Sequence, residues 1–283
     1  MVVPSLGLAF WIIGYPIYDV IMAASHEVNR FGKLRDFVGT GNFQTLMADP
    51  IFWGSFRRTI LWTVGVVAGT ILLSLPIALI LNDDFHGRGL MRVIIMLPWA
   101  VSLTMTAIVW TWSLHGQYGM VNETLQDLGL IGQPIQWLAT ARLAFPVEIL
   151  IGILVSIPFT TTVFLGGLAS LPGDIYEAAR IDGASVWQRF THLTLPLLKS
   201  FFNIALVLNV IHVFNSFPII WVMTKGDPAN GTDIFVTYLY KLAFLYGRIG
   251  DAAAMSLIMF SILLAFTLVY ARMVMRSEGA SRD

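Results

Sequence analysis

Long runs of apolar residues, separated by short polar segments, dominate this chain. Six of these runs come close to the roughly 20 residues that an α-helix needs to cross the hydrocarbon layer of a membrane. They cover residues 3–24, 59–81, 93–113, 147–169, 200–223 and 252–275. The pattern predicts an all-α integral membrane protein with six transmembrane helices, in which residues 1–283 form one transmembrane domain.

Two features modify this simple pattern. Residues 113–147 are of mixed polarity and rich in glycine, which indicates a loop with a short helix. Pro76, Pro98, Pro158 and Pro218 lie inside or at the edge of the expected spans. We expect the spans to tolerate these prolines, because neighbouring helices can satisfy the freed carbonyl groups.

Composition supports membrane embedding. The chain is 57% hydrophobic and only 12% charged, whereas soluble domains average about 25% charged residues. The formal net charge is zero, which argues against nucleic acid as a partner. The sequence contains no cysteine, so disulfides and cysteine-bound metals are excluded.

The distribution of basic residues bears on orientation. If both termini lie in the cytoplasm, the inner segments hold eight of the 17 Lys and Arg residues and the outer segments hold nine. The raw count does not choose a side. Because the inner loops are shorter, the density of basic residues favours cytoplasmic termini.

The longest polar block, DIYEAARIDGASVWQRFTHLTLPLL, covers residues 174–198. It holds two potential capping boxes in series, Asp174 with Glu177 and Ser185 with Gln188. Gly183 lies between them, where a helix can end in a left-handed conformation. The block therefore predicts a helix, a tight turn and a second helix, which form either a stable connector or a surface on which another protein docks.

The residues of this block resemble the EAA loop of binding-protein-dependent ABC importer permeases, here at about residues 171–199. The resemblance rests on Glu177, Ala178, Ala179, Asp182, Gly183, Ala184 and Pro196. It extends over most of the chain, through FVGTGNFQTLMADPIFW at 37–53, LPWAVSLTMTAIVWTW at 97–112, GDPANGT at 226–232 and GDAAAMS at 250–256. Together these segments resemble the carbohydrate permeases of the maltose and glycerol-phosphate type, most closely the longer partner of their usual heterodimer.

The resemblance implies a type I ABC importer permease in the bacterial cytoplasmic membrane, with both termini cytoplasmic. Its expected partners are a second homologous permease, two ATPase subunits or domains, an extracellular binding protein, a carbohydrate and the lipid bilayer. The resemblance implies that the EAA loop docks in a cleft of an ATPase. The chain has no GxxxxGK[ST] phosphate-binding loop. We therefore expect ATP and Mg on the partner ATPase, no bound cofactor on this chain, and no enzymatic activity.

Neutral polar residues inside the spans are the candidates for the substrate path. Asn209, His212 and Ser216 recur at helical spacing and are expected to share one face, with Asn215 beside it. By the resemblance, Gly152, Ser156, Phe159, Asn209 and Val213 match positions that line the sugar site of a maltose-type relative. The alternative is that such residues only join helices, each contributing about 0.6 kcal/mol. No histidines are spaced as a metal-binding pair. Tryptophans such as Trp11, Trp53, Trp62 and Trp99 are interpreted as membrane-interface anchors and not as sugar contacts.

Other classes fit less well. A membrane enzyme needs a charged or metal-binding cluster, and a channel or secondary transporter needs charges inside the membrane or detectable repeats. The sequence shows neither. Within the importer class, a polyol, a glycerol phosphodiester or a sugar phosphate stays open as an alternative cargo, because Arg57 and Arg58 lie near the expected outer mouth.

Overall fold

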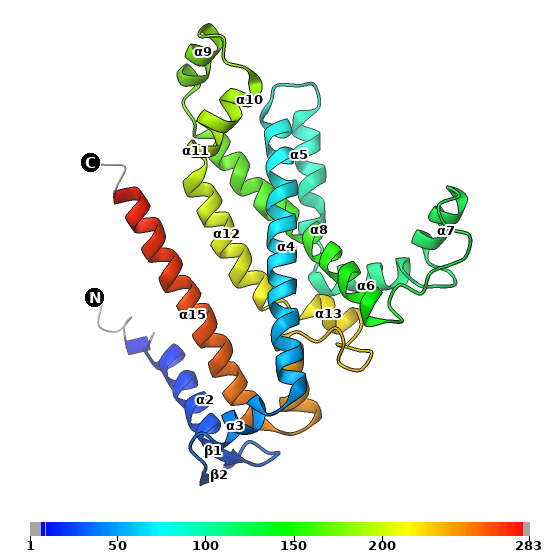
Figure 1. The fold of residues 1–283 in the computed structure, drawn as a ribbon, viewed down its shortest axis with the longest axis vertical. Helices are drawn as coiled ribbons and strands as arrows, with labels where there is room; N and C mark the ends of the chain where they lie inside the picture. Colours follow the sequence, from blue (N-terminus) through cyan, green and yellow to red (C-terminus); the bar gives the residue numbers. More distant parts are fainter. Residues whose placement is uncertain (1–6, 9, 280–283) are drawn as a thin grey trace. The chain divides into compact units, whose positions relative to one another are not determined.

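The computed structural model describes residues 7, 8 and 10–279 (Figure 1). Helices that are long and apolar enough to cross a membrane cover Pro50–Asn82, Ala141–Ala169, Lys199–Met223 and Ile249–Met275, and a bent pair of helices makes a fifth candidate. The first predicted span, 3–24, falls partly outside the described residues. Its described part is a shorter apolar helix, Phe10–Ser25. The count of six spans therefore stays a prediction.

Two compact units divide the chain, residues 1–59 with 225–283 (the terminal unit) and residues 60–224 (the central unit). Helix α4 (Pro50–Asn82) runs from one unit into the other. The single transmembrane domain expected from the sequence stays a prediction.

In the terminal unit, α2 (Tyr15–Ser25) and α3 (Gly41–Met47) pack against α15 (Ile249–Gly279). Strands β1 (His26–Val28) and β2 (Leu34–Phe37) pair antiparallel between α2 and α3. The fold is mostly helical, as predicted. The hairpin was not predicted, because strands of three and four residues are too short to give a detectable alternation. The remaining elements are η1 (Phe10–Gly14), α14 (Phe235–Tyr240) and η4 (Lys241–Leu245).

A buried ion pair organises the loop before α14. Lys241 Nζ lies 2.8 Å from Asp233 Oδ2 and donates to Asn230 Oδ1 at 2.9 Å, while Thr237 Oγ1 donates to Asp233 Oδ1 at 2.9 Å. Burial raises the pKa of Asp233 above its ordinary value, and the hydrogen bond from Lys241 opposes that shift. Because a buried charge without a partner is strongly destabilising, this pair fixes the fold of the loop that carries GDPANGT.

The central unit contains α5 (Arg88–Met96), η2 (Leu97–Ala100), α6 (Leu103–Ser113), α7 (Met120–Asp127), α8 (Ala141–Ala169), α12 (Lys199–Phe214) and α13 (Pro218–Met223). Trp62 of α4 fixes the packing of three helices. Its Nε1 donates to the carbonyl of Val213 on α12 at 2.9 Å, and its ring lies against Gly152 of α8, where a Cβ would approach it to 2.9 Å. The predicted short helix in the 113–147 loop is confirmed as α7.

The third predicted span, 93–113, is not one continuous helix. Its two halves, Arg88–Ala100 and Leu103–Ser113, meet at 93°. Pro98 has no backbone N–H, Val101 is extended, and Ser102 caps α6 by accepting a hydrogen bond from Met105 N at 3.2 Å. The expectation of an unbroken span is wrong, because Pro98 is followed by Ser102, whose side chain caps the start of a new helix.

Candidate functional site

A cavity of about 570 Å³ lies in the central unit where the bent pair passes α8 and α12. Its walls are formed by Pro98, Trp99, Val101, Ser102, Leu103, Val155, Ser156, Phe159, Leu208, Asn209 and His212. Its volume falls within the range of about 300–1,000 Å³ that is typical of small-molecule sites. The break at residues 98–102 therefore forms one wall of the cavity.

Two aromatic side chains meet on this wall. The ring centroids of Trp99 and Phe159 are 5.9 Å apart, with the planes tilted by 42°, and Trp99 is 57% exposed. The sequence interpretation left Trp99 out of the site, whereas the residue lines the cavity. The signal that could have identified it is its place directly after Pro98, at the break. The anchor interpretation is wrong for Trp62, whose side chain is buried between helices.

Asn209 both joins helices and lies in the cavity wall. Its Nδ2 donates to Thr160 Oγ1 of α8 at 2.9 Å and to the carbonyl of Ala205 at 2.8 Å, and the residue is 3% exposed. Within the described part of the chain, no protein group donates to its Oδ1. Ser156 and His212 line the same cavity, so three of the predicted polar residues come together.

The other predicted path residues do not line this cavity. Gly152, Val213 and Ser216 line a small hollow against Trp62. Ser156 and His212 line both the hollow and the cavity, so the two are neighbours. Asn215 is exposed and its Nδ2 donates to the carbonyl of Ile211 in its own helix. His212 lies beside Asn209 on the cavity and beside Ser216 on the hollow, although α12 ends at Phe214 and Ser216 lies in the break before Pro218. A shared face for the three residues stays a prediction.

The polar block forms the predicted helix, turn and helix, α9 (Gly173–Ile181) and α10 (Val186–Arg189). Gly183, at φ +77°, ends α9: its N–H donates to the carbonyl of Arg180, and the Ala184 N–H donates to the carbonyl of Ala179 at 2.9 Å. This is the Schellman arrangement, which needs a left-handed residue at the glycine position. Three residues of the motif, Ala179, Gly183 and Ala184, therefore take part in this turn.

Only one of the two predicted capping boxes is present. Ser185 and Gln188 exchange both hydrogen bonds at the start of α10. The box of Asp174 and Glu177 is wrong, because α9 already begins at Gly173, with Pro172 as its cap residue. Asp174 therefore has helical dihedral angles, and it stabilises the first turn through its charge.

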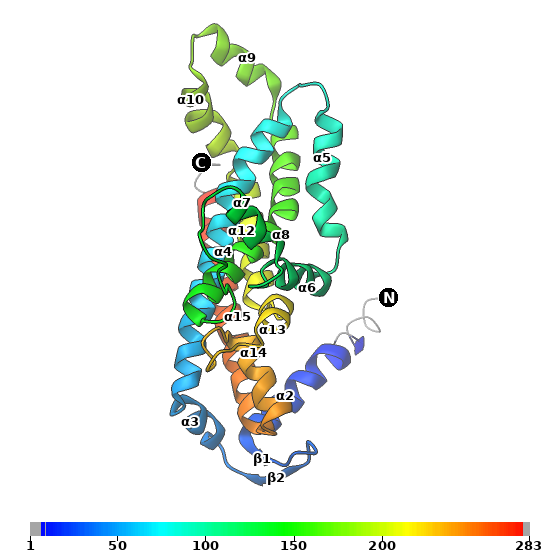
Figure 2. The same cartoon turned by 90° about the vertical axis from the view of Figure 1, so that its right-hand side faces the viewer.

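The exposed surface of this block carries both polar and apolar side chains. Glu177, Ala178 and Asp182 are exposed, and Ile181 and Trp187 are 87% and 71% exposed. Figure 2 shows α9 and α10 beyond the ends of α8 and α12. An exposed apolar patch with a polar rim is typical of a protein-binding surface.

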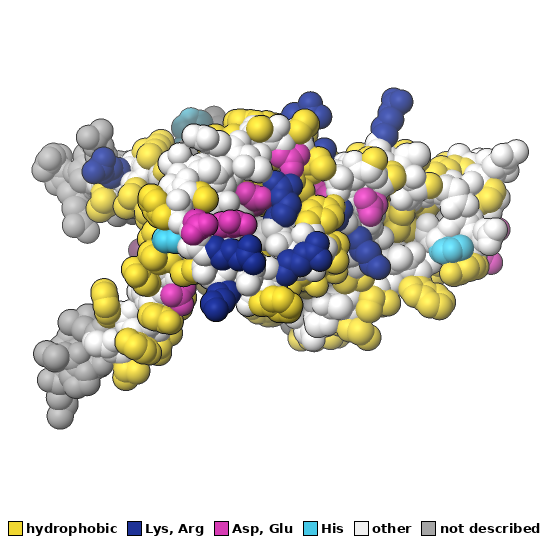
Figure 3. All heavy atoms as spheres, turned by 90° about the horizontal axis from the view of Figure 1, so that it is seen from below, with side chains coloured by type: hydrophobic (Ala, Val, Ile, Leu, Met, Phe, Trp, Pro, Cys, Tyr) yellow, Lys and Arg dark blue, Asp and Glu magenta, His cyan; other side chains and the backbone are white. Residues whose placement is uncertain are grey.

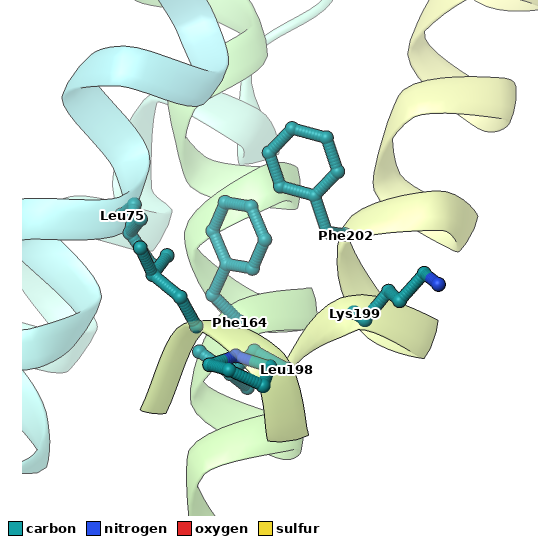
Figure 4. Close-up of a pocket in the computed structure, with 7 residues that line it drawn as sticks. Leu75, Phe164, Leu198, Lys199 and Phe202 are labelled. Atoms are coloured by element: carbon teal, nitrogen blue, oxygen red, sulfur yellow. The ribbon is translucent and has the colours of Figure 1, made fainter. Parts of the chain in front are cut away.

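The block returns to the membrane helices through η3 (Phe190–Thr194) and α11 (Leu195–Leu197). Tyr176 OH and Thr194 Oγ1, 3.1 Å apart, join α9 to this return. Pro196 lines an apolar pocket of about 190 Å³ with Leu75, Phe164, Leu195, Leu198, Lys199 and Phe202 (Figure 4). The rings of Phe164 on α8 and Phe202 on α12 pack with centroids 6.3 Å apart. Pro196, where the block returns to α12, therefore lies at the contact between these two helices.

Residues 20–278 match the family described as "Binding-protein-dependent transport system inner membrane component". The chain belongs to this family. It is the permease subunit of an ABC importer and a multi-pass protein of the inner membrane. Among the described residues, no cluster of three or more His, Cys, Asp and Glu side chains is arranged to hold a metal ion.

Several relatives match over nearly the whole length. A probable ABC transporter permease protein of Brucella suis biovar 1 (strain 1330) is 60% identical over 98% of this chain and 96% of its own. The trehalose/maltose transport system permease protein MalF of Thermococcus litoralis is 36% identical over 95% of this chain and 90% of its own. The sulfoquinovosyl glycerol transport system permease protein SmoG of Agrobacterium fabrum is 31% identical over 97% of this chain and 89% of its own.

A solved structure supports the fold. A chain of a bacterial alginate ABC transporter, in complex with a periplasmic protein bound to an alginate pentasaccharide, superposes with a TM-score of 0.84. The match covers 98% of this chain and 93% of that chain at 24% sequence identity. The permease therefore has the fold of that transporter.

Proposed function

We propose that this permease forms part of the translocation path for a carbohydrate that an extracellular binding protein delivers. The cavity carries the proposal, because it combines the aromatic pair Trp99 and Phe159 with neutral polar side chains. A sugar presents the complementary surfaces, since its C–H faces pack on aromatic rings and its hydroxyl groups exchange hydrogen bonds with few, well-placed polar groups. The relative named for trehalose and maltose supports this class of cargo.

The predicted path residues divide by position. Ser156, Phe159, Asn209 and His212 lie on the cavity and are proposed to contact the cargo. Gly152 and Val213 shape the helix packing behind it, and Asn215 and Ser216 lie at the break where α12 ends. We add Trp99 as the main aromatic contact.

The exposed block of α9 and α10 is proposed to couple transport to ATP. Glu177, Ala178, Ala179, Asp182, Gly183, Ala184 and Pro196 form this EAA loop. Glu177 is exposed and offers a partner a negative charge. Ile181 and Trp187 are exposed apolar side chains that a partner would bury on binding. ATP binding would close two ATPase subunits and pull the loop, and the Schellman turn at Gly183 keeps the loop rigid enough to transmit that motion.

This function implies an orientation in the membrane and a set of partner proteins. The loop and both termini lie in the cytoplasm, and a second homologous permease completes the path. ATP and Mg bind to the partner ATPases, so this chain has no catalytic role of its own. A binding protein docks on the outer side. The complex with a periplasmic protein in the related alginate transporter supports this arrangement.

A second candidate cargo is a glycoside of glycerol or a charged sugar derivative. The relative named for sulfoquinovosyl glycerol favours it. Uptake assays should therefore include neutral disaccharides, polyols, glycerol phosphodiesters and sugar phosphates side by side.

Charge reversal on α9 tests the coupling role. Glu177→Lys should abolish ATP-dependent uptake and lower co-purification of the ATPase, because it places a positive charge on the docking helix. Glu123→Lys is the matched control, since Glu123 is also an exposed glutamate on a short helix, α7. Wild-type uptake and co-purification of Glu177→Lys would contradict the assignment of the loop.

A further inference from the structure

The tip of the β1–β2 hairpin presents an aromatic side chain to the outside. Phe31 is 94% exposed. Arg30 and Lys33, which belong to the same turn, are also exposed, and so is Arg35, which lies 3.8 Å from Glu27 in an ion pair. Removal of a large apolar side chain from water is favourable, so Phe31 is a candidate contact for a partner.

The exposure of Phe31 is built into the turn. Asn29 Oδ1 accepts hydrogen bonds from the backbone N–H groups of Phe31 at 3.0 Å and Lys33 at 2.9 Å. Gly32, at φ +78°, donates to the carbonyl of Asn29 at 2.9 Å. The turn is therefore a hydrogen-bonded structure that holds Phe31 outward.

The root of the hairpin is fixed where two apolar helices end. Helix α2 stops at Ser25, and Asn42 Nδ2 donates to the carbonyls of Ala24 and His26, both at 2.9 Å. At Gly250, one residue into the span that starts at Ile249, a Cβ would lie 2.8 Å from Asn42 Nδ2. The hairpin thus begins beside the first residues of α15, a candidate membrane span.

The hairpin also rests on the segment that precedes α15. A Cβ at Gly247 would lie 2.9 Å from Arg30 Cγ, so the arginine stem packs on this glycine. Phe244 and Tyr246, in the same segment, are 71% and 44% exposed. Seen from below, where β1, β2 and α3 lie in Figure 1, Lys and Arg side chains lie beside hydrophobic ones (Figure 3).

We propose that the hairpin tip is an interfacial anchor that binds anionic phospholipid. Phe31 inserts among the headgroups, and Arg30 and Lys33 pair with lipid phosphates. Aromatic side chains concentrate at the membrane–water boundary, and basic residues are attracted to anionic lipid surfaces. We favour lipid over a protein partner because the hairpin is fixed between the end of the apolar helix α2 and the start of α15, a candidate membrane span. The proposal is independent of the cargo and of the EAA loop.

Because the chain has no cysteine, a single labelled residue can report on the tip. The full-length Phe31→Cys protein carries an environment-sensitive fluorophore in nanodiscs of phosphatidylcholine with or without phosphatidylglycerol. We expect a blue-shifted emission and quenching by headgroup-proximal doxyl lipids, stronger with phosphatidylglycerol. Asp182→Cys, in the exposed turn between α9 and α10, is the control and should stay unquenched.

A charge-removal arm tests the role of the basic side chains. Adding Arg30→Gln or Lys33→Gln to Phe31→Cys should lower the population of the inserted tip about fivefold per charge in phosphatidylglycerol discs. Equal quenching in both lipid mixtures, unaffected by these substitutions, would overturn the role of anionic lipid. A label that is unquenched by doxyl lipid but shielded by a binding protein would overturn the anchor and identify a protein-docking surface instead.

Discussion

The side-chain amide of Asn209 donates a hydrogen bond to Thr160 Oγ1 at 2.9 Å, which joins α12 to α8 beside the cavity. Hydrogen bonds between membrane helices contribute about 0.6 kcal/mol on average. A double-mutant cycle of Asn209→Ala and Thr160→Val should therefore give a coupling energy of about this size in the free energy of unfolding. The measurement is denaturant unfolding in detergent or bicelles.

Thr162 provides the control for this cycle. Its Oγ1 bonds to the carbonyl of Pro158 in its own helix. The pair of Asn209→Ala and Thr162→Val should therefore show additive effects. Equal coupling in both cycles would mean that the cross-helix hydrogen bond is not what stabilises this contact.

Trp99 should control the apparent affinity for cargo. Loss of an aromatic contact is expected to cost about 0.5–1.5 kcal/mol, which raises the substrate concentration for half-maximal uptake roughly two- to tenfold. Trp112→Ala is the matched control, because Trp112 is 66% exposed on the same bent pair and is not among the cavity-lining residues. Concentration-dependent uptake in proteoliposomes separates the two, and a Trp99→Ala protein with unchanged half-saturation would remove Trp99 from the path.

Gly183 should be required for coupling. An L-residue in the left-handed conformation is strained by about 1–2 kcal/mol, so Gly183→Ala is expected to distort the Schellman turn and lower ATP-dependent uptake. Gly173→Ala is the control, since Gly173 has ordinary dihedral angles and open space at its Cβ position. Uptake and cargo-stimulated ATPase activity are measured for both, and equal activity of the two variants would contradict a special role for the turn.

The ion pair of Asp233 and Lys241 should stabilise the terminal unit. Asp233→Ala leaves a buried lysine without its carboxylate and is expected to destabilise the fold by about 3–5 kcal/mol. Asp227→Ala should cost no more than about 1 kcal/mol, because Asp227 is 61% exposed and lies 3.8 Å from Lys241 Nζ. Thermal unfolding compares them, and similar melting temperatures would show that the buried pair contributes little.

The spans that the sequence predicted correctly are those in which apolar length alone decides. Helices α4, α8 and α15 contain the predicted runs with additional turns at their ends. The bend in the third span was missed because a proline in a membrane helix is compatible with either a kink or a break. Ser102 favours a break because it caps the start of α6. A single serine within an apolar run is a weak sequence signal for such a cap.

The candidate site was predictable in its polar residues and less so in its geometry. The sequence identifies Asn209 and His212 as polar residues in an apolar span, and both line the cavity. Ser216 shares a small hollow with His212, and the break before Pro218, which the helical periodicity did not predict, separates it from α12. Trp99 was missed because tryptophan near a span end has the same sequence appearance whether it faces lipid or a cavity.

Uptake by reconstituted proteoliposomes tests whether this permease carries a carbohydrate as part of an ABC importer. The permease is reconstituted with its second permease and the ATPase subunits, and labelled carbohydrates are supplied with the binding protein outside. The account predicts uptake that requires ATP, the binding protein and all subunits, with none by this chain alone. Carbohydrate uptake by this chain alone, without ATP, would contradict the account and indicate a secondary transporter.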